Sequence, residues 1–276
     1  MSATPDQYGL FGHPVSHSLS PFIHGLFARD TGQQMTYRAY DVLPEDFSGR
    51  VRSFFAGGGR GLNITLPHKL AAAALADELT ERASQAAAVN TLVRQGDSVL
   101  GDNTDGEGLV RDLCNNLGLV ITGSRVLILG AGGATRGVLA PLLGLEPASL
   151  TIANRTPDRA AALAAEFADL GKTRSVSFAD IDERPFDLII NATSASLSGE
   201  IPPIPRAAVT ESTVCYDLAY GRSETAFVKW ALECGCARAE QGLGMLAEQA
   251  AESFRLWRGM RPQTAPVLAA LRARPM

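Results

Sequence analysis

The sequence lacks the features that mark membrane proteins, secreted proteins and nucleic-acid-binding proteins. No run of about 18 uninterrupted apolar residues is present, so no segment has the length of a membrane-spanning helix. Residues Met1–Gln7 have neither the basic start nor the apolar stretch of a signal peptide. The formal net charge is −4, and this slightly acidic balance argues against nucleic acid or an anionic membrane as the main partner. We expect a soluble cytoplasmic protein, a monomer or a homodimer, whose partner is a small molecule.

Cysteine and histidine are also scarce, and their spacing predicts neither a metal site nor a disulfide. The four cysteines are Cys114, Cys215, Cys234 and Cys236. The close pair reads Cys-Gly-Cys, which matches neither a zinc ribbon nor a redox-active Cys-x-x-Cys. His13 and His17 are four residues apart, but the proline and serines around them prevent the continuous helix that a metal-binding pair would need. We interpret the cysteines as packing residues in a reducing compartment.

What the sequence does contain is an alternation of short β-like runs with helical stretches rich in alanine and leucine, which is typical of an α/β protein with parallel sheets. The predicted strands are Tyr8–Gly12, Tyr37–Val42, Gly61–Thr65 and Asn90–Arg94, then Arg125–Gly130, Ser149–Ala153, Phe186–Asn191 and Thr213–Leu218. Predicted helices include Ala71–Ala76, Asp158–Phe167 and Leu243–Trp257. The length of 276 residues suggests two domains, with a seam in the turn-rich segment Gly101–Gly108. Composition leaves open to which domain the last helices belong.

A glycine-rich turn follows the strand that begins at Arg125. Gly130, Gly132 and Gly133 allow the backbone to turn tightly and approach a pyrophosphate, and the helix that follows offers free N–H groups. Thr135 stands where such a fingerprint usually has Gly or Ala. The alternative is a turn made tight for packing only. Because a strand precedes the turn and a helix follows it, we favour a dinucleotide site.

The end of the next predicted strand indicates which dinucleotide binds. An NAD enzyme usually has a carboxylate here for the ribose 2′-hydroxyl, whereas this chain has Asn154, Arg155 and Arg159. A guanidinium is always charged and can hold two oxygens of a 2′-phosphate at once. In the alternative interpretation, Thr156 caps a helix that starts at Pro157 and the arginines are simply solvated. We favour NADP over NAD.

Polar clusters in the first half are candidates for a substrate site, and each has a structural alternative. Ser18 and Ser20 precede Pro21, where they could cap a helix or cradle a carboxylate, and the residues alone do not decide. Asn63 and Thr65 alternate at the end of a strand, so both side chains are expected on one face.

Lys69 is the most informative of these polar residues. Pro67 suits the first position of a helix, which places Lys69 in the first turn. A cation there opposes the helix dipole at a cost of about 0.3–1 kcal/mol, and a locally unfavourable residue is a hint of function. A solvated surface lysine is the alternative.

Three further polar residues lie in positions that suit either a ligand contact or a structural role. Asn90 precedes an apolar run and needs partners if buried. Asp105 could cap the next helix, and Thr104 has capping-box spacing to Glu107. Gln249 places an amide on an otherwise apolar helical stripe.

Taken together, nine short segments in this order resemble the shikimate dehydrogenase family, and the resemblance extends from about Tyr8 to Pro266. In residue numbers they are His-Ser-Leu-Ser-Pro (17–21), Asn-Ile-Thr-Leu-Pro-His-Lys (63–69), Ala-Val-Asn-Thr-Leu (88–92), Gly-Asp-Asn-Thr-Asp-Gly (101–106), Gly-Ala-Gly-Gly-Ala (130–134), Asn-Arg-Thr (154–156), Asn-Ala-Thr-Ser (191–194), Tyr-Asp-Leu-Ala-Tyr (216–220) and Gly-Leu-Gly-Met-Leu (242–246). Each segment alone is modest evidence, but the ordered series is specific.

The resemblance implies an NADP-dependent oxidoreductase that reversibly reduces 3-dehydroshikimate to shikimate, in the chorismate pathway to aromatic amino acids. It implies that Lys69 and Asp105 form the catalytic pair, with Lys69 as proton donor and acceptor. It also implies a discontinuous α/β substrate domain, residues 1–104 with 242–276, and a Rossmann-type NADP-binding domain with a parallel sheet, residues 105–241.

The remaining site residues are likewise carried over from the family. The substrate contacts implied are Ser18, Ser20 and Tyr220 for the carboxylate, and Asn63, Thr65, Asn90 and Gln249 for the ring hydroxyls and Lys69. The cofactor contacts implied are Gly130, Ala131, Gly132, Gly133, Ala134, Asn154, Arg155, Thr156, Arg159, Thr193, Gly242 and Met245, and no metal is expected.

Two departures from the family pattern concern loops on the cofactor side. Gln241 stands where the family commonly has Asp, and the segment 194–198 lacks a glycine that is often found there. Two alternatives to the predicted function remain. One is a quinate/shikimate dehydrogenase with broader cofactor use, and the other is a non-catalytic NADP-binding sensor, against which the presence of both Lys69 and Asp105 argues.

Overall fold

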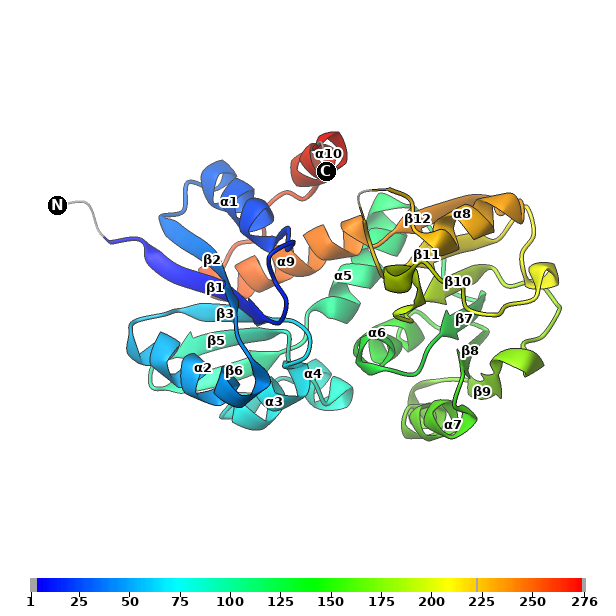
Figure 1. The fold of residues 1–276 in the computed structure, drawn as a ribbon, viewed down its shortest axis with the longest axis horizontal. Coiled ribbons are helices and arrows are strands. Elements are labelled where there is room, and N and C mark those ends of the chain that lie inside the picture. Colours follow the sequence, from blue (N-terminus) through cyan, green and yellow to red (C-terminus); the bar gives the residue numbers. More distant parts are fainter. Residues whose placement is uncertain (1–3, 222, 275–276) are drawn as a thin grey trace. The chain divides into compact units, whose positions relative to one another are not determined.

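The computed structural model describes residues 4–221 and 223–274, and they form two compact units (Figure 1). The first unit contains the described residues up to Gly108 and those from Leu246 onward, and the second contains Leu109–Met245. The chain therefore leaves the first unit once and returns to it. The predicted boundaries, after Thr104 and Gln241, lie a few residues before these transitions. Which function each unit serves stays a prediction.

The first unit is built on a six-stranded mixed sheet with the order β2-β1-β3-β5-β6-β4. The strands are β1 (Asp6–Gly12), β2 (Met35–Asp41), β3 (Gly61–Ile64), β4 (Glu78–Leu79), β5 (Thr91–Gln95) and β6 (Ser98–Asp102). The sheet is not fully parallel as the alternating pattern suggested, because β5 runs antiparallel to both β3 and β6. Only Gly96 and Asp97 separate the paired residues Gln95 and Ser98, and a parallel connection needs a far longer crossover. Gly96 has a φ of 63°, the left-handed conformation that such a tight hairpin requires.

Helices cover both faces of this sheet (Figure 1). One face packs on α2 (Phe47–Ala56) and α3 (Lys69–Leu75), whose core includes Phe47, Val51 and Ile64. The other face packs on α1 (Ser20–Asp30), α9 (Leu243–Arg258) and α10 (Ala265–Ala273), whose core includes Phe27 and Phe254. The short α4 (Glu81–Ala86) and a 3-10 turn (Pro44–Asp46) complete the unit, and α5 (Asp105–Arg111) carries the chain onward. The last helix-forming segments therefore belong to the first unit.

The second unit contains a six-stranded sheet in which every strand pair is parallel. Its order is β12-β11-β10-β7-β8-β9, from β7 (Arg125–Leu129), β8 (Ser149–Asn154), β9 (Thr173–Ser177), β10 (Leu188–Asn191), β11 (Val214–Asp217) and β12 (Arg238–Gln241). This is the doubly wound Rossmann order, with the reversal between β7 and β10. The predicted Rossmann-type fold with a parallel sheet is confirmed.

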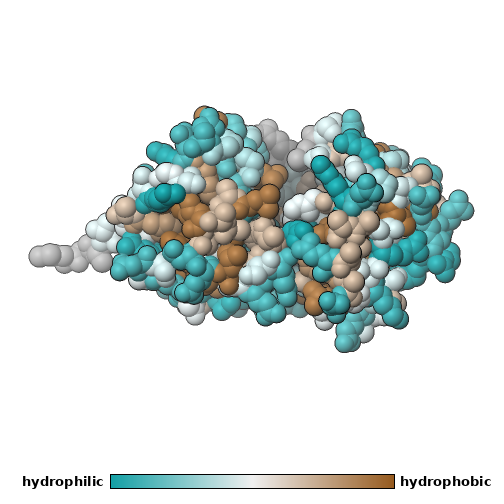
Figure 2. Space-filling model, turned by 90° about the horizontal axis from the view of Figure 1, so that it is seen from below, coloured by the Kyte–Doolittle hydropathy of each residue, from teal (hydrophilic) through white to brown (hydrophobic). Residues whose placement is uncertain are grey.

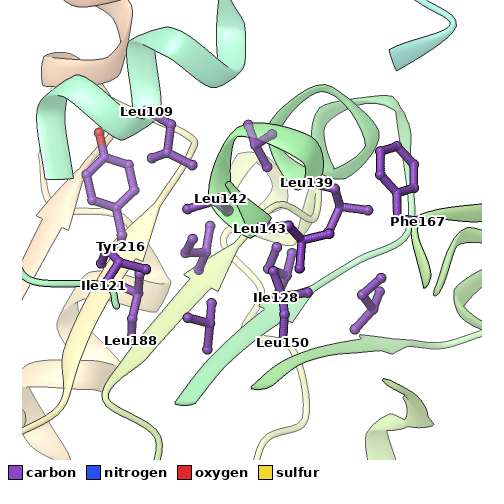
Figure 3. Packing of buried hydrophobic residues seen from close by; sticks show 14 of the residues in the cluster. Leu109, Ile121, Ile128, Leu139, Leu142, Leu143, Leu150, Phe167, Leu188 and Tyr216 are labelled. Carbon is purple, nitrogen blue, oxygen red and sulfur yellow. The ribbon is translucent and has the colours of Figure 1, made fainter. Parts of the chain in front are cut away.

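Two layers of helices and turns enclose this parallel sheet. The helices are α6 (Gly133–Leu143), α7 (Pro157–Glu166) and α8 (Ala226–Glu233), with a π-helical turn (Asp112–Asn116) and 3-10 turns at Ala168–Leu170, Phe178–Asp180, Ala195–Ser198 and Arg206–Ala208. Figure 3 shows Leu142 and Leu143 of α6 packed toward Ile128 and Leu150 of the sheet, and all four are buried. Truncating one such leucine to alanine typically costs about 2–5 kcal/mol, so this core contributes strongly to holding α6 against the sheet.

On the face drawn in Figure 2, hydrophilic residues are interspersed with smaller groups of hydrophobic ones. Among residues 4–221 and 223–274, no helix has the length and apolar character needed to cross a membrane.

Candidate active site

Lys69 and Asp105 form an ion pair in the first unit. Lys69 is the first residue of α3, and its Nζ donates a hydrogen bond to Asp105 Oδ2. The Lys69 side chain is 23% exposed and that of Asp105 is 12% exposed. The helix begins two residues after Pro67, because the turn before it is closed by the His68 N–H donating to Thr65 O at 3.0 Å. Pro67 therefore precedes the helix instead of starting it.

Asn90 holds the second oxygen of the Asp105 carboxylate. Asn90 Nδ2 donates to Asp105 Oδ1 at 2.8 Å, and Asn90 Oδ1 accepts the Thr104 N–H at 2.8 Å. The Asp105 N–H donates to Asn103 Oδ1 at 3.1 Å. Asp105 is the first residue of α5 and so does not occupy the cap position that the structural alternative gave it, and its carboxylate faces Lys69 and Asn90. The turn before α5 therefore aims this carboxylate at the lysine.

Gln249 joins the same cluster from α9. Its Oε1 lies 3.3 Å from Asn90 Nδ2 and 3.4 Å from Thr104 Oγ1, and its Nε2 donates to Leu246 O at 2.9 Å. The structure thus brings together four residues that the sequence places far apart, Lys69, Asn90, Asp105 and Gln249. Their roles toward a substrate stay predictions.

Behind Asn90 lies a buried polar layer in which the predicted site residue Asn63 meets residues that the sequence did not identify. Asn63 Nδ2 approaches Ser253 Oγ at 2.9 Å and Asn90 O at 3.3 Å, and Tyr37 donates to Asn63 Oδ1 at 2.8 Å. Ser253 was missed, although it lies four residues after Gln249 and so on the same face of α9. Tyr37 and His24, the other members of the layer, carry no local signal that would have identified them.

The two predicted serines lie at the start of α1. This helix begins at Ser20 itself, so Leu19 occupies the cap position that was predicted for Ser20. The Ser18 hydroxyl accepts the Ser20 N–H at 3.2 Å. Ser18 therefore makes one local hydrogen bond at the start of the helix, which agrees with the structural alternative to carboxylate binding.

Thr65 follows the end of β3, and its methyl group lies close to Gly12. A Cβ at Gly12 would come within 2.2 Å of Thr65 Cγ2, which explains why a glycine stands there. Within residues 4–221 and 223–274 the Thr65 hydroxyl makes no hydrogen bond, and it is half-buried. This hydroxyl is therefore available to a ligand.

The glycine turn of the second unit has the geometry of a dinucleotide loop. Gly130 has a φ of 104°, and a Cβ there would lie 3.2 Å from Ala192 O, so both backbone conformation and space favour glycine. Gly132 and Gly133, at the start of α6, face open space. The departure at Thr135 is accommodated because its buried hydroxyl donates to Gly130 O at 2.8 Å.

Asn154 connects this turn to the loop after β8. Its Oδ1 accepts the Ala131 N–H at 3.2 Å, and its Nδ2 donates to Thr156 O at 2.9 Å. Thr156 occupies the N-cap position of α7, but its side chain makes no capping hydrogen bond. Arg155 and Arg159 are exposed, and neither guanidinium has an ion-pair partner in the described part of the chain. Ala134 lies within the first turn of α6.

The loops after β10 and β11 are held by a buried carboxylate. Asp217 accepts hydrogen bonds from Ser196 Oγ at 2.5 Å and Thr225 Oγ1 at 2.6 Å. Asn191 bridges the two loops, because its Nδ2 donates to Asp217 at 3.2 Å and its Oδ1 accepts from the Thr193 hydroxyl at 2.7 Å. The predicted cofactor contact Thr193 is thus fixed at the carboxyl end of the sheet, where ligands of such folds bind.

Tyr220 follows the loop after β11. Burial raises the pKa of its phenol. Its neighbour Gly221 donates its N–H to Gln241 Oε1 at 2.8 Å, so the glutamine that departs from the family pattern ties this loop to β12.

Gly242 and Met245 lie where β12 passes into α9. A Cβ at Gly242 would come within 2.4 Å of Leu218 O, so this position requires glycine. The Met245 N–H donates to the Tyr216 hydroxyl at 3.2 Å, which itself donates to Asp112 at 2.6 Å. Burial, followed by the Asp112 charge, raises the pKa of Tyr216 well above its usual range.

Neither a metal cluster nor a cysteine pair is part of either site. Among the described residues, no three His, Cys, Asp or Glu side chains gather as a metal ion would need. The four cysteines are free thiols, and Cys215 is fully buried in the core beneath α8.

Comparison with known proteins covers almost the whole chain. Residues 10–92 match the model of the shikimate dehydrogenase substrate binding domain, residues 113–219 match that of shikimate / quinate 5-dehydrogenase, and residues 242–272 match that of the shikimate 5′-dehydrogenase C-terminal domain. A shikimate dehydrogenase (NADP(+)) of Methylococcus capsulatus is 56% identical over 270 residues, covering 98% of this chain and 97% of the relative.

Solved structures show the same fold over the same length. An Ael1 enzyme from Pseudomonas putida has a TM-score of 0.93 and 44% identity, covering 98% of this chain and 100% of that one. A shikimate 5-dehydrogenase from Thermus thermophilus, solved with NADP(H) and shikimate, has a TM-score of 0.87 and 34% identity, covering 97% and 98% of the two chains.

Proposed function

Because this chain belongs to the shikimate dehydrogenase family, we propose that it catalyses the reversible NADPH-dependent reduction of 3-dehydroshikimate to shikimate, a step toward aromatic amino acids. The observation that carries the proposal is the Lys69–Asp105 ion pair, whose carboxylate is held from behind by Asn90. Reduction of a ketone to an alcohol needs one hydride at carbon and one proton at oxygen. This pair is suited to handle the proton.

Lys69 is the group that we assign to proton transfer. Its ammonium donates a proton to the ketone oxygen as that oxygen gains negative charge during reduction. Asp105 aims the ammonium through their hydrogen bond, while Asn90 fixes the rotation of the carboxylate. In the oxidation direction, the neutral Lys69 amine accepts the hydroxyl proton of shikimate.

The residues of the second unit fit NADP. When bound, NADPH supplies the hydride. The open space at Gly132 and Gly133 and the free N–H groups that begin α6 suit a pyrophosphate, and Asn154 holds that turn against the loop after β8. Arg155 and Arg159, which have no protein partner in the described residues, would hold the 2′-phosphate. Gly130, Ala131, Ala134, Thr156, Thr193, Gly242 and Met245 complete the proposed set.

We assign the substrate contacts to the polar groups around the ion pair and at the start of α1. The unpartnered Thr65 hydroxyl, Asn90 and Gln249 would bind ring hydroxyls. The hydroxyls of Ser18 and Ser20 would bind the carboxylate, and the family resemblance implies the same for Tyr220. A site made of neutral hydroxyl donors suits an anion in a protein of net negative charge.

The test crosses shikimate and quinate with NADP and NAD, following absorbance at 340 nm with the purified protein. The proposal predicts rapid reduction of NADP with shikimate and little reduction with quinate or NAD. Turnover with quinate and NAD would instead place the protein among enzymes with broader cofactor use. No turnover with any pair, while NADP still binds, would favour a non-catalytic sensor.

A further inference from the structure

Tyr37 lies on β2, between the first two of the nine short motifs in the sequence, yet its phenol belongs to the polar layer behind the proposed catalytic pair. Its hydroxyl donates to Asn63 Oδ1 at 2.8 Å. Burial raises the pKa of Tyr37, and a hydrogen bond from Ser20 partly offsets this effect. The phenol therefore touches a predicted carboxylate-binding serine on one side and Asn63 on the other.

The Asn63 amide can adopt only one orientation in this setting. Its oxygen faces the Tyr37 hydroxyl and His24 Nε2, the latter at 3.2 Å. Its nitrogen faces three acceptors, which are Ser253 Oγ at 2.9 Å, Thr91 Oγ1 at 3.2 Å and Asn90 O at 3.3 Å. Because an amide oxygen only accepts, His24 must donate from Nε2, as the neutral ring with its proton on that nitrogen can do. Burial lowers the pKa of His24 to about 3, which keeps it in this form at neutral pH.

From Asn63 the hydrogen bonds continue to the carboxylate. The Thr91 hydroxyl lies 2.8 Å from Ser253 Oγ and donates to Asn90 Oδ1 at 2.9 Å. Asn90 Nδ2 then donates to Asp105 Oδ1 at 2.8 Å. Asn63, Asn90 and Thr91 are at most 5% exposed, so water does not compete for these bonds.

We propose that Tyr37 is a positioning residue for the proposed reaction. Its hydroxyl sets the Asn63 amide, and Asn63 acts through Thr91 and Asn90 to orient the Asp105 carboxylate beside Lys69. In this arrangement the Asn63 amide is fully engaged with protein groups and supports Asn90 instead of contacting the ring. The inference rests on the proposed function, because it concerns the same reaction.

The kinetic test compares Tyr37→Phe with Tyr40→Phe. Both tyrosines lie on β2, and the Tyr40 ring packs edge-on against Phe11 and Phe54 while its hydroxyl makes no hydrogen bond within the described residues. Loss of one donor to a buried acceptor predicts that Tyr37→Phe lowers kcat by about three- to tenfold. The KM values for shikimate and NADP should stay within about twofold of wild type, because the proposed role of Tyr37 is to position Asp105 and not to bind a ligand. Tyr40→Phe should leave kcat and KM unchanged.

Testing Tyr37→Phe a second time, in a protein that already carries Asn63→Ala, separates positioning from a general structural effect. When Asn63→Ala has removed the amide, Tyr37→Phe should lower kcat no further, because its route to Asp105 is gone. A loss in that background as large as in wild type would overturn the inference, as would an unchanged kcat in Tyr37→Phe alone or equal losses in the Tyr37 and Tyr40 variants.

A readout without turnover keeps the inference distinct from the proposed function. In ¹⁵N spectra of the full chain, Tyr37→Phe should shift the side-chain amide signals of Asn63 and Asn90, and Tyr40→Phe should leave both in place. Unmoved Asn90 signals in Tyr37→Phe would contradict the positioning role. If Tyr37→Phe causes these shifts but the wild-type protein turns over no substrate, the proposed function alone is refuted.

Discussion

Asn154 and Arg155 are neighbours in the sequence, but their side chains serve different purposes. Asn154 bonds inward to Ala131 and Thr156, and so shapes the turn. Arg155 is exposed and, in the described part of the chain, has no acidic partner. An exposed guanidinium at this position suits the proposed 2′-phosphate contact, because it is always charged and can bind two phosphate oxygens at once.

Replacement of Arg155 tests this assignment at the level of one residue. Arg155→Ala should raise the KM for NADP by about tenfold or more, because a charge-assisted hydrogen bond contributes about 1.5–3 kcal/mol. The KM for NAD, which lacks the 2′-phosphate, should barely change. Arg174→Ala is the matched control, since Arg174 is an exposed arginine of the same unit on β9. Equal loss for NADP and NAD in Arg155→Ala would refute the role in 2′-phosphate binding.

Among the elements, the sequence predicted eight strands that the structure contains and missed β4, β6, β9 and β12. The predictions around β1, β3, β7 and β8 agree with the structure to within two residues at each end. The edge strands β9 and β12 were missed because they are half-buried along most of their length and their polar residues give no apolar run. Edge position alone does not decide the outcome, because the edge strand β2 was predicted and the interior strand β6 was missed.

Helix α9 carries a charged network that no local pattern predicts. Glu252 accepts hydrogen bonds from Arg255 at 2.7 Å, from Arg261 at 2.8 Å and from Arg82 at 3.2 Å. Arg82 also binds Asp102 at 2.6 Å, three residues before Asp105. These residues come from three distant parts of the chain, and only the fold brings them together. The network therefore ties α9 and α4 to the strand that leads into the candidate site.

This network predicts a stability that depends on acid pH. Burial alone would raise the pKa of Glu252, but the Arg255 hydrogen bond and the charges of Arg255 and Arg82 outweigh it and lower the pKa to about 2. A lowered carboxyl pKa stabilises the folded state fully above the unfolded value of 4.5, and this contribution is lost as the pH falls toward about 2. After allowance for solvent screening, we expect Glu252 to contribute about 1–3 kcal/mol to the free energy of unfolding at neutral pH.

Urea unfolding at about pH 6 and about pH 3 measures this contribution. Wild type should lose more unfolding free energy between the two pH values than Glu252→Gln does. Glu45→Gln, which changes an exposed glutamate of the same unit, should behave like wild type. The same acid loss in all three proteins would show that Glu252 does not contribute as proposed.

For the whole molecule, the family and the Rossmann-type fold could be predicted because they depend on nine ordered segments, and the comparisons confirm both. The polar layer behind the candidate site could not be predicted, because Tyr37, Asn63, Thr91 and Ser253 come together only through the packing of β2, β3, β5 and α9. The mixed pairing of the first sheet did have a local signal in the turn residues Gly96 and Asp97, but it was missed because no strand was predicted at β6.

The central claim is that Lys69 transfers the proton in a site whose binding groups are separate from it. Its most direct test is Lys69→Ala, measuring kcat for shikimate oxidation with NADP and, separately, shikimate affinity by calorimetry. Removal of a general acid–base should lower kcat by about 10²–10⁴-fold while the shikimate Kd changes little. Turnover close to that of wild type, or a loss seen only in shikimate affinity, would contradict the assignment of Lys69.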